Sequence, residues 1–200
     1  MQSPTSSQPA ENESTSKPRK SFYNYRGALV SPPLLFAMFS TWREWENEPA
    51  VWILAGVIFM LGVGIRIWSQ QHLRFRLRMG MNLTNTGPYA LLRNPIYVGN
   101  TLICLSMITV SELMWLLPVQ LALCIFTYAM VVRYEESHLT GLYGEPYREY
   151  LEQVPRWIPR VPSGYKPGFI TPHLLASIRT EAYNVLLLVP YILKELLWGR

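Results

Sequence analysis

A pair of adjacent carboxylates and a short arginine-containing motif are the parts of this sequence whose residue types could do chemistry. Glu135 and Glu136 follow the end of a long apolar stretch, and Arg93-Asn94-Pro95 comes just before its start. Pro95 suits the first turn of a helix, where its missing N–H costs nothing. Arg93 and Asn94 would then lie at a helix N-terminus, whose free N–H groups, together with the forked guanidinium, can bind a carboxylate or another anion.

Both groups have a structural interpretation as well. Arg93 can contact lipid headgroups, with Tyr89 and Tyr97 in the aromatic belt of a membrane protein. Glu135 or Glu136 can instead pair with Arg93 or Arg133 and so join two polar segments. Residue types alone leave these alternatives open.

The elements that position these residues are apolar and helical. Residues 51–68 and 96–132 are nearly free of charge. A transmembrane helix needs roughly 20 apolar residues, so the second stretch is too long for one crossing. Ser111-Glu112 interrupts it, which predicts a helical hairpin. We therefore expect an all-α integral membrane protein with about five transmembrane helices, two of which form the hairpin.

The chain divides into three predicted parts. Residues 1–20 are polar and contain no apolar run, which is typical of a disordered tail. Residues 21–172 form the membrane domain, with predicted spans at about 27–42, 51–68, 96–110 and 114–132. Within the first span, Pro32-Pro33 predicts a kink or a helix that begins after the prolines.

The third part, residues 173–200, contains the last apolar run of the chain, residues 182–198. We expect this run to cross the membrane as a fifth helix, the alternative being an amphipathic helix that lies in the interface. It begins after a polar, proline-rich segment.

Charge predicts the orientation. Lys and Arg concentrate before the first span and in residues 69–94, and such segments face the cytoplasm. The N-terminus, residues 69–94 and residues 133–180 are therefore predicted to be cytoplasmic. Topology and anionic lipid account for the formal charge of +5, so we expect membrane lipids and no nucleic acid as partners. The three histidines have no metal-ligand spacing, so we expect no metal site.

The segment after Glu135 predicts two short helical faces. Leu139 and Tyr143 follow Glu135 at steps of four residues, which places an apolar stripe on its helix face. Gly144 can end that helix in a positive-φ conformation, and Pro146 can start another. The second helix carries Tyr147, Tyr150 and Val154 on one face, and Pro155 stops it.

In this order and at these separations, the motifs resemble those of the isoprenylcysteine carboxyl methyltransferase family, which is related to the phospholipid N-methyltransferases. The resemblance covers roughly residues 60–160. It rests on Arg66, Trp68, His72, Leu73, Gly87-Pro88-Tyr89, Arg93-Asn94-Pro95-Ile96-Tyr97-Val98-Gly99, Glu135-Glu136, Leu139, Tyr143-Gly144, Tyr147, Tyr150, Val154-Pro155-Arg156 and Pro159. It implies a membrane enzyme that binds S-adenosylmethionine from the cytoplasm, releases S-adenosylhomocysteine and takes a lipid-like or prenylated acceptor from the bilayer.

The resemblance also implies roles for individual residues. By matching position, those around the cofactor are Leu83, Thr84, Tyr89, Asn94, Pro95, Ile96, Tyr97, Glu135 and Glu136. The implied catalytic residues are Arg93, Tyr97 and Glu135. The family commonly has His at the position of Asn94, and an amide can donate and accept hydrogen bonds but cannot titrate. Val131 occupies the position of the family's substrate-binding arginine, which leaves the neighbouring Arg133 as the candidate.

The predicted function is methyl transfer to a lipid-like acceptor, a carboxylate such as isoprenylcysteine or an aminolipid. One alternative is a sterol- or enone-type membrane reductase that uses NADPH, because such proteins have a similar Tyr-Gly, Tyr, Val-Pro pattern near the membrane. Another is a non-catalytic lipid-binding membrane protein. The sequence leaves the acceptor and the oligomeric state open.

Overall fold

A computed structural model describes residues 8–40, 48–78, 83–168 and 173–198, and all regular secondary structure in this part is helical. Its helices are α1 (Gln8–Val30), α2 (Pro32–Phe39), α3 (Glu48–Arg78), α4 (Pro88–Leu91), α5 (Pro95–Val110), α6 (Leu116–Tyr143), α7 (Glu145–Gln153) and α8 (Leu174–Trp198). No strand occurs among these residues. The all-α prediction is confirmed.

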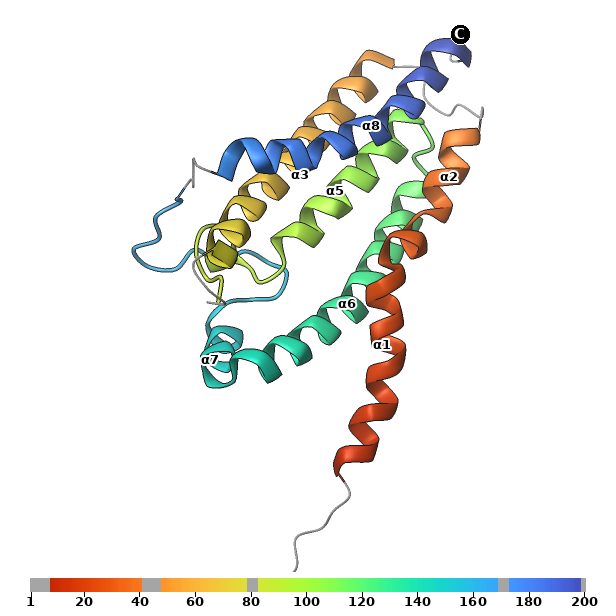
Figure 1. Ribbon diagram of the computed structural model, residues 1–200. Coiled ribbons are helices and arrows are strands. Elements are labelled where there is room, and N and C mark those ends of the chain that lie inside the picture. Colours follow the sequence, from red (N-terminus) through yellow and green to blue (C-terminus); the bar gives the residue numbers. More distant parts are fainter. Residues whose placement is uncertain (1–7, 41–47, 79–82, 169–172, 199–200) are drawn as a thin grey trace, which may run out of the picture.

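Five of the described helices, α1, α3, α5, α6 and α8, form the body of the molecule. α3 packs along α5, and α1 packs along α6. α5 and α6 are the arms of the predicted hairpin, and the turn between them contains Glu112 at φ 59°. α8 lies against α3 and α5, on the far side of α5 from α1 (Figure 1). α7 and the adjoining loops lie at one end of this body, where α5 begins.

Two of the helices are long and apolar enough to cross a membrane, α3 over Pro49–Leu73 and α6 over Leu116–Tyr143. α5 is a shorter apolar helix. Large apolar side chains are exposed on the outer faces of both long helices, among them Ile53 and Met60 on α3 and Ile125 and Phe126 on α6. Such exposure agrees with membrane association. The other three predicted crossings stay predictions.

One helix boundary differs from the sequence-based expectations, and two others agree with them. Residues 8–20, expected in a disordered tail, form the first half of α1, because extending an existing helix requires little nucleation free energy. α6 continues beyond the predicted membrane span, which ends at residue 132, and stops at Tyr143. This confirms the helix that was predicted to end at Gly144. The first predicted span is broken at Ser31, and α2 begins at Pro32, as the proline pair predicted.

Two glycines allow α3 and α5 to approach closely. A Cβ on Gly62 would lie 2.9 Å from the Gly99 carbonyl oxygen and 2.9 Å from a side-chain carbon of Ile103. A Cβ on Gly99 would lie 2.8 Å from the Gly62 carbonyl oxygen. Small residues at such crossings bring helix backbones together in membranes. By contrast, nothing lies within 4 Å of a Cβ on Gly64.

We expect Gly62→Leu to destabilise the protein by about 1–3 kcal/mol, because the side chain would overfill the α3–α5 contact. Gly64→Leu is the matched control on the same helix and should change stability by less than about 0.5 kcal/mol. Thermal unfolding in detergent measures both variants. Equal stability of the two variants would contradict the assigned contact.

Candidate active site

A cavity of about 1130 Å³ lies between α1, α2, α5, α6 and α8. Its polar end is at the N-terminus of α5, where Tyr89, Asn94, Tyr97 and Glu135 line the wall. Toward the C-terminus of α5 the lining becomes mainly apolar. This apolar end is formed by Leu34, Leu35 and Met38 of α2, Ile103 and Met107 of α5, and Leu187, Pro190 and Tyr191 of α8.

Most of the residues that the sequence singled out meet at this cavity. They are Tyr89, Arg93, Asn94, Pro95, Ile96, Tyr97, Glu135 and Glu136. Three others lie outside it. Leu83 packs against the Tyr147, Tyr150 and Val154 cluster, Thr84 is not part of the lining, and Arg133 is exposed on α6. Arg133 is thus placed away from the cavity, because the turn of α6 that carries Glu135 to the wall directs residue 133 outward.

Hydrogen bonds join the two motif-bearing segments. The Tyr150 hydroxyl donates to the Tyr89 carbonyl at 2.8 Å, and the Arg93 amide donates to the Pro155 carbonyl at 2.9 Å. The Asn94 side-chain amide donates to the Arg156 carbonyl at 3.2 Å. Burial raises the pKa of Tyr150 above its usual range, so its hydroxyl stays a neutral donor. These bonds fix the start of α5 against the segment after α7.

Local sequence explains the geometry of these segments. Gly87 adopts φ 58° before α4, and Gly144 adopts φ 63° between α6 and α7. The prediction of a positive φ at Gly144 is confirmed. At Gly87 the absence of a Cβ likewise allows the positive φ. Pro95 is in the first turn of α5, and α7 ends before Pro155. Tyr147, Tyr150 and Val154 form the expected apolar cluster with Leu139 and Tyr143 packed against it.

Glu136 forms an ion-paired cluster with two arginines. Its carboxylate lies 3.1 Å from Arg93 Nη1 and accepts hydrogen bonds from Arg156 at 3.1 and 2.5 Å. The hydrogen bond with Glu136 raises the pKa of Arg156, so that guanidinium stays charged. This confirms, for Glu136, the alternative that one carboxylate of the acidic pair joins two polar segments through Arg93. The Arg93 Nε atom is buried and has no hydrogen-bond partner in the described part.

Glu135 has a different environment from its neighbour. It lies on the cavity wall, and the Tyr97 hydroxyl donates to its Oε1 atom at 2.7 Å. The Tyr97 ring packs on Tyr128, with ring centroids 4.8 Å apart. Glu135 makes no ion pair in the part of the chain that the structure describes, so its second oxygen remains available to a ligand.

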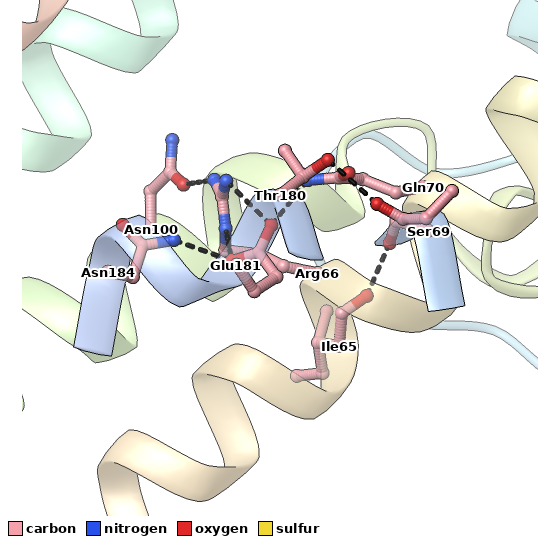
Figure 2. Close-up of polar contacts among 9 residues, drawn as sticks. Ile65, Arg66, Ser69, Gln70, Asn100, Thr180, Glu181 and Asn184 are labelled. Carbon is pink, nitrogen blue, oxygen red and sulfur yellow. Dashed lines mark hydrogen bonds and ion pairs between the residues drawn. The ribbon is translucent and has the colours of Figure 1, made fainter. Parts of the chain in front are cut away.

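A second buried ion pair closes the α8 side of the cavity. Arg66 of α3 donates to Glu181 of α8 at 2.7 and 3.0 Å and also to the Asn100 side chain of α5 (Figure 2). Gln70 and Asn184 donate to the same carboxylate. Glu181 is only 2% exposed, and the cluster fixes α8 against α3 and α5. Sequence reasoning missed Glu181, since no motif surrounds it.

His72 holds the turn before α4. Its Nε2 atom lies 2.7 Å from the Gly168 carbonyl, which can only accept, so Nε2 carries the hydrogen. Its Nδ1 atom then accepts from the Thr86 hydroxyl at 3.0 Å. This histidine therefore supports the site from outside the cavity. Among the described residues there is no group of three or more His, Cys, Asp or Glu that could hold a metal ion.

Comparisons with known proteins give matches to a family model and to curated proteins. Residues 50–146 match the family model described as phospholipid methyltransferase. The chain is 26% identical over 139 residues to nickel-cobalt-cadmium resistance protein NccN of Alcaligenes xylosoxydans xylosoxydans, covering 66% of this chain and 62% of NccN. It is 30% identical over 106 residues to cobalt-zinc-cadmium resistance protein CzcN of Cupriavidus metallidurans, covering 51% of this chain and 48% of CzcN. The alignments thus span less than two thirds of these relatives. No solved structure matches.

Proposed function

We propose that the protein transfers a methyl group from S-adenosylmethionine to a lipid-like acceptor. The premise is that this chain belongs, through residues 50–146, to the phospholipid methyltransferase family. The family indicates a membrane methyltransferase, and the two long apolar helices agree with membrane association. The proposal adds the donor, the acceptor class and the placement of the polar end of the cavity on the cytoplasmic side.

The observation that carries the proposal is one cavity with a polar end and an apolar end. A site for one small ligand usually encloses roughly 300–1,000 Å³, and this cavity of about 1130 Å³ leaves room for two. Asn94, Tyr97 and Glu135 supply hydrogen-bonding groups for a polar cofactor at the start of α5. The apolar lining suits the tail of an acceptor from the bilayer.

Methyl transfer makes defined demands on these residues. The acceptor attacks the methyl carbon as the carbon–sulfur bond breaks, and the sulfonium charge is consumed. The protein must therefore align the two ligands and exclude water. A carboxylate acceptor attacks directly, whereas an ammonium acceptor must first lose a proton, for which Glu135 is the base that faces the cavity. The unpartnered Arg93 Nε–H can donate to a ligand oxygen, while Glu136 balances the charge of Arg93.

Calorimetric titration of the detergent-purified protein tests the proposal. We expect S-adenosylhomocysteine to bind with micromolar affinity and NADPH not to bind. Binding of NADPH alone would favour the membrane reductase, and binding of neither by folded protein would favour a non-catalytic role. Labelled S-adenosylmethionine then identifies the acceptor among prenylcysteines, aminophospholipids and other lipid acids.

A further inference from the structure

Of the described residues that line the cavity, three carry a guanidinium group: Arg26, Arg66 and Arg93. Two of them are neutralised by protein carboxylates. Arg66 pairs with Glu181, as Figure 2 shows, and Arg93 pairs with Glu136. Their charges are therefore balanced before any ligand binds.

Arg26 of α1 differs from the other two. Its Nη1 atom donates to the Tyr23 carbonyl at 2.6 Å, and its guanidinium lies 4.5 Å from the centre of the Tyr23 ring. Within the described ranges, no ion pair joins it to a carboxylate. A guanidinium has five N–H donors and a permanent positive charge, so most of its donors remain for a ligand.

The position of Arg26 links the two ends of the cavity. On one side it interacts electrostatically with Glu135 and Tyr97. On the other side the lining continues along α1 and α2 through Val30, Leu34 and Met38, and all of these carry apolar side chains. A molecule with its anionic group at Arg26 can therefore extend an apolar chain along this wall while its head lies near Glu135.

We propose that Arg26 binds the anionic group of the methyl acceptor and so selects an amphiphile that carries an oxyanion beside an apolar chain. This inference rests on the proposed function and extends it to α1, which lies outside the matched residues 50–146. The oxyanion is either the carboxylate that receives the methyl group or the phosphate beside a reacting amine. Both chemistries suit a forked guanidinium.

Direct binding tests the inference without turnover. The probes are dodecanoate, dodecyl phosphate and the uncharged methyl dodecanoate, titrated into full-length protein in detergent. We expect at least one anionic probe to bind the wild type more tightly than the neutral ester. Arg26→Gln should weaken that binding about 10- to 100-fold, to the level of the ester, and leave the Kd for S-adenosylhomocysteine unchanged. The preferred anion distinguishes a carboxylate from a phosphate acceptor.

Arg133→Gln is the matched control, because Arg133 is exposed on α6 outside the cavity, and it should change no affinity. Arg26→Lys keeps the positive charge but loses the forked guanidinium, so it should bind the anionic probe with intermediate affinity. This intermediate affinity separates ligand binding from a structural role. The variant also replaces Arg26→Gln in the test if Arg26→Gln does not fold. Weaker binding of S-adenosylhomocysteine to Arg26→Gln, with anion binding intact, would overturn the inference and assign Arg26 to the cofactor. Equal affinity of the wild type for all three probes would also overturn it.

The two proposals fail separately. If the wild type binds the anionic probes through Arg26 but does not bind S-adenosylhomocysteine, the anion site stands and the methyltransferase function falls. If it binds S-adenosylhomocysteine but does not distinguish anionic from neutral probes, the function stands and the acceptor inference falls.

Discussion

Glu135→Gln is expected to weaken binding of S-adenosylhomocysteine by about 1.5–3 kcal/mol, which is roughly a 10- to 150-fold rise in Kd. Glutamine preserves the shape of the side chain and can still accept the hydrogen bond from Tyr97. Under the proposed function, it removes the negative charge that would strengthen a bond to the amino group or a ribose hydroxyl of the cofactor. The fold should therefore survive while binding falls, and calorimetric titration measures the loss.

Glu152→Gln provides the control, since Glu152 is an exposed carboxylate on α7 and lies outside the cavity. Thermal unfolding of the ligand-free variants checks that both are folded. A Glu135→Gln protein that binds S-adenosylhomocysteine as tightly as the wild type does would exclude Glu135 from the cofactor site. A loss shared by Glu152→Gln would indicate a nonspecific effect of charge.

The parts of the site that the sequence predicts are those set by local chemistry. Pro95 at the start of α5 and the positive-φ turn at Gly144 follow from what proline and glycine do to a backbone. The cluster around Tyr147 and Tyr150 follows from helical spacing. Together they bring the two motif-bearing segments to one end of the cavity.

The residues that the sequence does not predict depend on packing between distant segments. Glu181 lies 115 residues after its partner Arg66, and their contact exists because α8 packs on α3. Arg26 reaches the cavity because α1 packs along α6, and no motif on α1 marks it. Conversely, Arg133 was the substrate-binding candidate because it neighbours Val131, which holds the position of the family's arginine. Its own position on the helix directs it outward.

Glu136 shows how two adjacent carboxylates acquire different tasks. Its side chain is 11% exposed and holds Arg93 of the segment before α5 and Arg156 of the segment after α7 together. Glu135, its neighbour, is joined to Tyr97 and faces the cavity. Mutation of the two residues should therefore affect different properties of the protein, cofactor affinity for Glu135 and stability for Glu136.

We expect Glu136→Gln to lower the free energy of unfolding by about 3 kcal/mol, because it leaves the largely buried Arg93 guanidinium uncompensated, whereas the Arg156 side chain is 37% exposed and stays solvated. The exposed Glu145–Arg148 pair is the matched comparison, with side chains 69% and 63% exposed. Glu145→Gln should cost less than about 1 kcal/mol. Thermal and denaturant unfolding in detergent measure both variants.

A double-mutant cycle separates this ion pairing from a general loss of packing. Arg156→Gln should cost less in the Glu136→Gln background than in the wild type, because the carboxylate that Arg156 contacts at 2.5 Å is already neutral. Strict additivity of the two changes would argue against coupling through Glu136. If Glu136 couples to Arg156 and the Glu135→Gln protein has normal stability, the two carboxylates have separate roles. Glu136 then holds the motif segments together, and Glu135 binds the ligand.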